Sequence, residues 1–168
     1  MEILVFSDSH GRLDKIEEAL SLQIKKPDAI IFLGDGLRDI ANAETGEIPV
    51  YSVRGNCDTL IMSYSPDEQC LILGDKRVFF THGNKYGVKS TLTPLISEAA
   101  KREADIVLYG HTHEAFECEL APDNEYAIKL KSTLYIMNPG SIGSYPYYFG
   151  VITIDKSGRV LMSHGSLN

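Results

Sequence analysis

Five short apolar runs in this chain each stop at a small or polar residue, and the next positions bring Asp, Asn or His. The five segments are VFSDSH, IFLGDG, VRGNCD, FFTHGN and LYGHTH. Runs of this kind are typical of buried strands in α/β proteins. Because the loops beyond the carboxyl ends of such strands meet at one crevice, the pattern predicts a shared polar site. The residues that it would collect are Asp8, His10, Asp35, Asn56, His82, His111 and His113.

Apolar periodicity predicts how the remaining chain is organised. A strand over residues 2–7, a helix from Leu13 through Ile24 that ends before Pro27, a strand over 29–33 and a short helix to residue 42 give a βαβα opening. Further strands are expected over 49–53, 70–73, 78–81 and 106–109, with a helix over 91–102. After His113 the turn signals Pro-Asp-Asn and Lys-Ser-Gly predict mostly antiparallel strands over 116–120, 126–130, 134–137, 149–154 and 160–162.

Length and charge exclude several classes of protein. The 168 residues predict a single domain over 1–168. The net charge of −7, with no long basic run, argues against non-specific binding to nucleic acid. No stretch is apolar enough to span a bilayer and the first residues lack signal-peptide features, so we expect a cytoplasmic protein with no membrane partner. Cys57, Cys70 and Cys118 fit neither a disulfide framework nor a zinc motif, so we expect reduced thiols.

The donor types in the predicted site indicate metal binding. Three oxygen donors and four imidazoles, without a thiolate, suit Mn, Fe, Ni or Zn. Seven donors exceed one tetrahedral site but divide well between two ions about 3.5 to 4 Å apart that share a carboxylate. In extended backbone, positions i and i+2 project to one side, so we expect Asp8 with His10, and His111 with His113, to converge. His164 lies far from any motif, and we expect it to be a packed or surface residue.

The motifs DSH, GD, GNCD, THG and GHTH occur in the order found in the calcineurin-like metallophosphoesterase superfamily, and NPGSIG at 138–143 resembles a later segment of that family. The chain resembles the family along residues 1–168, and most of all its small bacterial and archaeal phosphodiesterase branch. The resemblance implies a four-layer α/β/β/α sandwich of two mixed sheets. It also implies two metal ions, manganese favoured. One would be held by Asp8, His10, Asp35 and His113, and the other by Asp35, Asn56, His82 and His111, with Asp35 as the bridge.

The function implied is that of a binuclear-metal phosphoesterase, above all a phosphodiesterase, which attacks a small phosphoester in line with water activated by the ions. Asn56, Asp58 and His111 are predicted to act in catalysis. Two alternatives stay open. One is a phosphomonoesterase, and the other is a non-catalytic scaffold such as the retromer subunit, whose metal motifs are altered at several ligands. The native metal, the physiological substrate and the oligomeric state, a homo-oligomer included, are also open.

Several residues near the motifs have two interpretations. Cys57 stands where larger relatives carry a histidine that resembles a general acid. The absence of that histidine favours activated esters or diesters as substrates. We expect Cys57 to be a small packed residue and not a nucleophile. Asp58 either orients a histidine ligand or binds substrate, or it caps a helix or turn. Arg54 contacts phosphate or forms a structural ion pair. Asn84 and Tyr145 are expected near substrate, with ordinary packing the alternative for the aromatic segment of Tyr145.

Overall fold

Two mixed five-stranded sheets form the centre of the computed structural model, which describes residues 1–58 and 65–168. The first sheet has the order β10-β9-β1-β2-β3 and the second has the order β4-β5-β6-β8-β7. The strands of the first sheet are β1 (Glu2–Phe6), β2 (Ala29–Phe32), β3 (Val50–Ser52), β9 (Tyr147–Ile154) and β10 (Val160–Leu167). Those of the second are β4 (Glu68–Leu73), β5 (Lys76–Thr81), β6 (Ile106–Leu108), β7 (Ala115–Leu120) and β8 (Leu134–Pro139).

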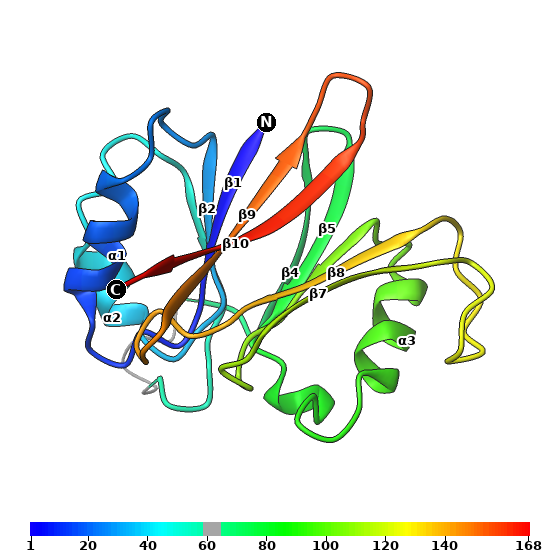
Figure 1. The fold of residues 1–168 in the computed structure, drawn as a ribbon. Coiled ribbons are helices and arrows are strands. Elements are labelled where there is room, and N and C mark those ends of the chain that lie inside the picture. The colour runs from blue at the N-terminus through cyan, green and yellow to red at the C-terminus, as the bar shows by residue number, and fades with distance from the viewer. Residues whose placement is uncertain (59–64) are drawn as a thin grey trace.

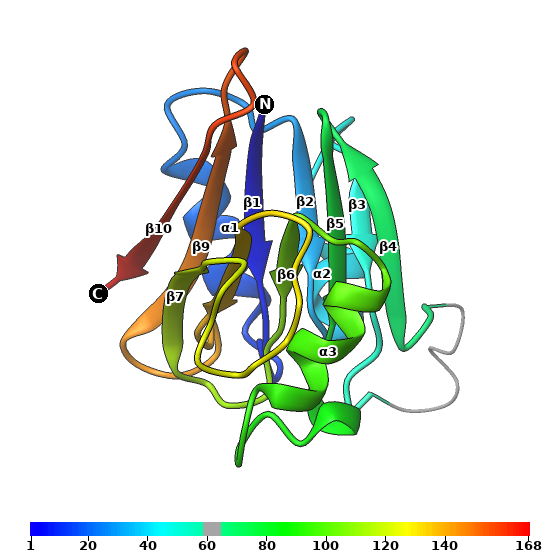
Figure 2. The same ribbon diagram turned by 90° about the vertical axis from the view of Figure 1, so that its right-hand side faces the viewer.

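Helices cover the outer face of each sheet. Leu4, Phe6 and Phe32 of the first sheet pack against α1 (Leu13–Ser21) and α2 (Leu37–Asn42). The outer face of the second sheet packs against α3 (Thr93–Lys101), which follows a 3-10 turn, η2 (Asn84–Tyr86). The inner faces meet in a third apolar cluster that takes residues from both sheets, including Val5 and Phe80. Figures 1 and 2 show the resulting layers. The four-layer sandwich implied by the resemblance is therefore confirmed.

The predicted strand over residues 126–130 is wrong. This stretch is a loop, and the Asn124 side chain bonds backbone groups that a strand would pair in a ladder: its Nδ2 donates to the Ile128 carbonyl at 2.7 Å and its Oδ1 accepts from Tyr126 N at 3.1 Å. The alternating apolar residues pack on the layer of α3 instead. The first helix is also shorter than predicted. It ends at Ser21, which leaves Ile24 outside it and fully exposed.

The loops after the parallel strands of both sheets meet at one edge of the sandwich. β1 pairs in parallel with β2, and β5 pairs in parallel with β6. Their carboxyl ends lie at the lower edge in Figure 1. Backbone bonds then tie the loops together: Asp8 N donates to the Gly34 carbonyl at 2.9 Å, and Gly110 N donates to the His82 carbonyl at 3.0 Å. Within the described ranges, no helix is long and apolar enough to cross a membrane.

Candidate metal centre

Asp8 presents one carboxylate oxygen that the described residues leave without a hydrogen-bond partner. Its Oδ2 accepts from the Ser7 hydroxyl at 2.5 Å and from His111 N at 3.0 Å. Its Oδ1 is buried and unpaired within residues 1–58 and 65–168. Imidazole nitrogens surround that atom, with His113 Nε2 at 3.1 Å and His10 Nε2 at 3.9 Å. An unpaired buried anionic oxygen is costly, so this atom and its imidazole neighbours fit a bound cation.

The His82 ring is held so that one nitrogen faces the other candidate ligands. Its Nδ1 lies 2.8 Å from the Leu33 carbonyl, which can only accept, so Nδ1 carries the proton. Nε2 then faces Asn56 Oδ1 at 3.1 Å, His111 Nδ1 at 3.2 Å and Asp35 Oδ2 at 3.4 Å, and without its proton it can bind a metal ion. This is the way in which metal-binding histidines are usually oriented by a second contact.

The acids around His82 favour a positive charge at that ring. Burial alone would lower the pKa of His82, but the hydrogen bond to Asp35 and the charges of Asp8 and Asp35 raise it overall. Burial would likewise raise the pKa of Asp35, but the bonds from His82 and from the Cys57 backbone N–H hold it well below its usual range. The buried Asp35 carboxylate is thus ionised. The site attracts a cation, either protons or metal ions.

The candidate ligands fall into two groups, and Asp35 lies close to donor atoms of both. Donor atoms of Asp8, His10 and His113 lie within 4.8 Å of one another, as do those of Asp35, His82 and His111. Asp35 also lies within that distance of His10. All seven residues predicted to bind metal, Asn56 included, are therefore brought to one place. Their individual coordination remains a prediction, and Asp35 stands where a bridge would be needed.

Left-handed backbone, and not extended backbone, brings these side chains together. The φ angles are +55° at Asp8, +46° at His10, +57° at Asp35, +69° at His111 and +63° at His113. The expectation that positions i and i+2 converge through an extended segment is therefore wrong. Each left-handed residue other than glycine costs on the order of 1 kcal/mol, and such strain is concentrated at functional sites. Left-handed backbone is found at five of the seven candidate ligands.

Asp58 holds two of the ligand-bearing loops together. One of its oxygens accepts from Gly36 N and Leu37 N, both at 2.9 Å, and the other from Asp35 N at 2.8 Å and Gly55 N at 2.9 Å. This is the cap geometry that the sequence left open as an alternative for Asp58, and its catalytic role remains a prediction. Gly55 is required beside it, because a Cβ there would collide with the Asp35 carboxylate and backbone.

Three residues that the motifs did not single out hold the ligand-bearing loops in position. Asn138 and Ser141 belong to NPGSIG, and Ser7 follows β1. Buried Asn138 donates through Nδ2 to the Gly110 carbonyl and to Thr112 Oγ1, both at 3.0 Å. Ser141 Oγ donates to the Asp8 carbonyl at 2.8 Å. Ser7, described above, fixes the Asp8 carboxylate. The NPGSIG segment was the available signal for Asn138 and Ser141, but its partners lie far away along the chain and only the fold reveals them.

Cys57 lies at the edge of the cluster and is exposed, so the expectation of a small packed residue is wrong. Its Sγ accepts from Asn56 Nδ2 at 3.3 Å, and its thiol, Asp35 and His10 come within 4.8 Å of one another. A hydrogen bond to Asp35, burial and nearby carboxylates raise the pKa of Cys57. A thiol that stays protonated near neutral pH is a poor nucleophile. This supports the interpretation that Cys57 does not attack phosphorus itself.

The three predicted substrate contacts occupy different surroundings. Arg54 Nη2 donates to Asp67 Oδ1 at 2.6 Å, which is the structural ion pair considered as its alternative. Asn84 is exposed at the start of η2. Tyr145 is 75% exposed and its ring lies edge-on to Tyr147 with centroids 6.0 Å apart. Their contacts to substrate remain predictions. His164 lies elsewhere, with Nε2 2.8 Å from the Asn138 carbonyl.

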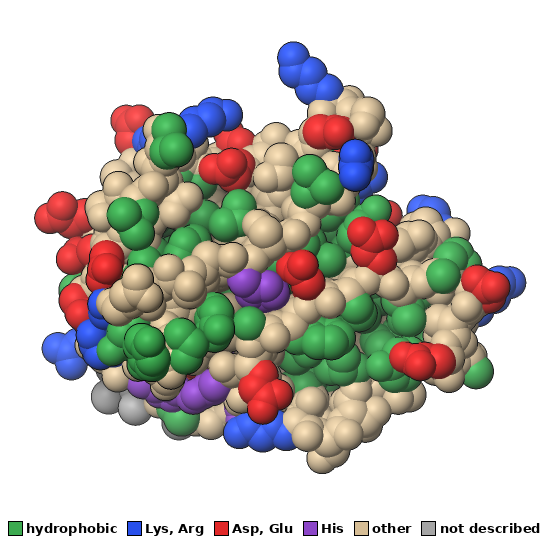
Figure 3. All heavy atoms as spheres, viewed as in Figure 1, with side chains coloured by type: hydrophobic (Ala, Val, Ile, Leu, Met, Phe, Trp, Pro, Cys, Tyr) green, Lys and Arg blue, Asp and Glu red, His purple; other side chains and the backbone are tan. Residues whose placement is uncertain are grey.

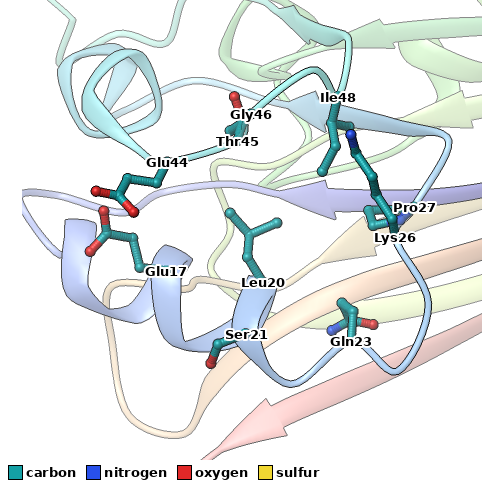
Figure 4. A pocket seen from close by; sticks show the side chains of 10 residues that line it. All are labelled: Glu17, Leu20, Ser21, Gln23, Lys26, Pro27, Glu44, Thr45, Gly46 and Ile48. Carbon is teal, nitrogen blue, oxygen red and sulfur yellow. The ribbon is translucent and has the colours of Figure 1, made fainter.

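A large hollow at the opposite end of the first sheet takes no part in this centre. It has a volume of about 570 Å³ and lies between the end of α1 and the loop that follows α2. Figure 4 shows Leu20 and Ile48 on its walls and the carboxylates of Glu17 and Glu44 pointing toward each other. None of the predicted site residues lines it. In Figure 3, by contrast, histidine side chains reach the surface at the lower edge, where the strand-end loops meet.

Comparison with known proteins agrees with this geometry. The chain is 30% identical over 115 residues to the probable metallophosphoesterase YsnB of Bacillus subtilis, covering 68% of this chain and 66% of that protein. It is 26% identical over 193 aligned positions to the phosphodiesterase YfcE of Escherichia coli K12, covering 99% of this chain and 95% of that protein.

Solved structures share the fold over the full chain. A predicted phosphoesterase from Streptococcus pneumoniae TIGR4 superposes with a TM-score of 0.73 at 26% identity, covering 99% of this chain and 97% of the other. A single mutant of Vps29 from Entamoeba histolytica superposes with a TM-score of 0.69 at 20% identity over the whole of both chains. The model of the calcineurin-like phosphoesterase superfamily domain matches residues 1–157. With this match and its candidate metal-ligand groups, the chain belongs to the calcineurin-like phosphoesterase superfamily.

Proposed function

We propose that this protein is a binuclear-metal phosphodiesterase. The observation that carries the proposal is the division of the donor atoms into two groups, with Asp35 in one group and within 4.8 Å of His10 in the other. Asp8, His10, Asp35 and His113 would hold one ion, and Asp35, Asn56, His82 and His111 the other. Two divalent ions would polarise the phosphoryl oxygens and lower the pKa of water. The name of YfcE as a phosphodiesterase supports the diester as substrate.

The charge of the site suits a phosphoester. Asp8, Asp35 and Asp58 supply three negative charges near the cluster, against the four positive charges of a divalent pair. A positive balance remains for a phosphate group. The side chains of Asp8 and His82 are fully buried, whereas those of His10 and His113 are 36% and 39% exposed. One face of the cluster is therefore closed by protein and the other is open to substrate.

The experiment combines metal analysis with turnover. Protein stripped with a chelator and reloaded with Mn²⁺ should contain two ions per chain, and should hydrolyse bis(p-nitrophenyl) phosphate faster than an alkyl phosphomonoester. Elemental analysis on the assayed sample connects the two results. A content that never exceeds one ion at saturating metal would contradict the binuclear site, and a faster monoester rate would favour the phosphomonoesterase alternative.

A scaffold of the retromer type is the second candidate, and the likeness of fold to Vps29 is the observation that favours it. The same assay separates the two. A fully metal-loaded protein without turnover of any phosphoester would support the scaffold. Against it stands the complete set of seven candidate ligands in this chain.

The remaining parts of the proposal concern the identity of the metal, the partners and the cellular location. The oxygen and imidazole donors, without a thiolate, suit Mn, Fe, Ni or Zn, and manganese is proposed among them from the resemblance to the family. A small phosphoester as partner is proposed from the family. A cytoplasmic location and the absence of membrane or non-specific nucleic-acid binding are proposed from charge and composition. Three cysteines that are free in the structure support a reducing compartment.

A further inference from the structure

A second hollow is lined in part by the loop that carries the candidate ligands His111 and His113. Its volume is about 590 Å³, and Thr112, which stands between His111 and His113, forms part of its wall. Thr112 Oγ1 accepts from Asn138 Nδ2 at 3.0 Å and from Glu114 N at 3.2 Å, so this wall is fixed in place.

The opposite wall is also connected to the cluster. Val88 lines the hollow and packs on Gly83, the residue after His82, so closely that a Cβ on Gly83 would lie 2.9 Å from a Val88 methyl group. One wall thus contains a neighbour of two candidate metal ligands, and the other packs on a neighbour of a third. A group attached to a phosphate at the metal centre would have this hollow as its neighbour. We call it the Phe116 pocket.

Aromatic side chains give the Phe116 pocket its character. Phe116 of β7 lines it and is 40% exposed, which is unusual for a side chain whose burial is worth about 1.5 to 3 kcal/mol. Tyr109 and Tyr126 line it as well. In Figure 3, hydrophobic side chains reach the surface between β7 and α3. Exposed aromatic surface beside a polar site is typical of a place where the ring of a ligand packs against the protein.

The polar groups of the pocket do not favour a second charged group. It contains one cation and one anion, Lys89 and Glu114, whose charges cancel. Neither side chain has an ion-pair partner within 4.0 Å in the part of the chain that the structure describes. The hydroxyls of Ser90 and Thr91 also line the pocket. The combination suits an uncharged planar ring with polar atoms on its edge.

We propose that the Phe116 pocket binds the aromatic ring of one ester group of the substrate, so that this chain selects phosphodiesters that carry a nucleobase or an aryl ring. This inference rests on the proposed phosphoesterase function. Stacking of a base on an aromatic side chain is worth about 1 to 3 kcal/mol, so the ring should strengthen binding roughly 5- to 150-fold.

The test measures binding of phosphate monoesters, the products, to Mn²⁺-loaded protein by calorimetry. Thymidine 5′-monophosphate should bind at least about 5-fold more tightly than methyl phosphate, which has no ring. Phe116→Ala should remove most of this ratio and leave methyl phosphate binding unchanged, while Phe116→Tyr should keep it. Ile72→Ala is the matched control, because Ile72 is an exposed apolar side chain, 60% accessible, at the far end of β4.

The outcomes separate this proposal from the proposed function. Phenyl phosphate distinguishes the two sources of a ring: tight binding means that any aryl group is accepted, and weak binding means that the nucleobase edge is read. Equal affinity of wild type for thymidine 5′-monophosphate and methyl phosphate would overturn the Phe116 pocket, as would an equal loss of both in Phe116→Ala. Hydrolysis of bis(p-nitrophenyl) phosphate is assayed separately on the same samples, and its absence would count against the enzyme and not against the pocket.

Discussion

At the scale of single residues, the site depends on how a few side chains are oriented. His82 can present Nε2 to the cluster because the Leu33 carbonyl holds the proton on Nδ1. Asp8 can leave Oδ1 for a cation because Ser7 and His111 N occupy Oδ2. These second contacts determine which atom of each ligand is free.

His82→Ala should lower metal content and phosphoesterase activity, the activity by at least about 100-fold, with the fold retained. The side chain is fully buried but faces other ligands, so its loss removes a donor atom and few apolar contacts. Elemental analysis, circular dichroism and turnover check this. His164→Ala is the control, because it removes an imidazole outside the cluster and should keep both ions. A metal-replete and fully active His82→Ala would show that His82 is not a ligand.

Cys57→His should raise monoester turnover relative to diester turnover. The Cys57 thiol, with its raised pKa, cannot transfer a proton near neutrality as an imidazole can. A well-placed general acid is worth about 10² to 10⁴-fold. The measurement is the ratio of rates for an alkyl monoester and bis(p-nitrophenyl) phosphate with both ions bound, and Cys57→Ser serves as the control. An unchanged ratio in Cys57→His would remove our explanation for the preference for diesters.

At the scale of elements, the carboxyl ends of strands from two sheets are fastened to one another by loops. Asp58 connects the loop after β3 with the loop after β2 and with the start of α2 through four backbone N–H groups. Asn138 of β8 fastens the loop after β6. The strained backbone of the ligand residues is held by this set of bonds.

Asp58→Ala should lower the stability of the metal-free protein by about 3 kcal/mol, because four N–H groups lose a charged acceptor. For a chain of this size the melting temperature should fall by roughly 6 to 12 °C. Mn²⁺ binding should also become weaker, because the Asp35 backbone N–H loses its hydrogen bond to the Asp58 carboxylate. Thermal unfolding and metal titration measure the two effects. Asp123→Ala changes an exposed loop carboxylate and should alter neither. Wild-type stability and metal affinity in Asp58→Ala would rule out this bracing role.

At the scale of the whole molecule, the candidate metal centre lies where loops of the two sheets meet. The predicted ligands come from loops of the first sheet, with Asp8 and Asp35, and of the second, with His82 and His111. Bound ions would therefore connect the two sheets at one edge, in addition to the apolar cluster between them.

Metal removal should lower the stability of the folded protein. At 100 times the dissociation constant, an ion that binds only the native state contributes about 2.7 kcal/mol per site. The melting temperature of wild type should then fall by roughly 5 to 11 °C for each ion removed by a chelator. Calorimetric scans with and without Mn²⁺ check this, and His82→Ala should show a smaller difference. The same melting temperature in both states would contradict a metal centre that joins the sheets.

The sequence alone predicts the local properties of the chain. Strand runs such as 29–33 and the helix with Leu13 and Ile16 show in the spacing of apolar residues, because that spacing follows backbone periodicity. The ligand types were equally visible, because an imidazole or a carboxylate has its chemistry wherever it lies. The order of the motifs then supplied the family, the sandwich and the grouping of the ligands.

Only the tertiary structure decided how those residues act. The left-handed backbone of His111, the acceptor for His82 Nδ1, three of the four donors to Asp58 and the exposure of Phe116 each depend on a segment far away in the sequence. The loop over 126–130 is a further example, because its alternating apolar pattern predicts a strand. Hydrogen bonds from Asn124 and packing against the α3 layer stabilise a loop there instead. Sequence patterns determine what a residue can do locally, whereas long-range contacts determine which backbone conformation is stable and which atom remains free to bind.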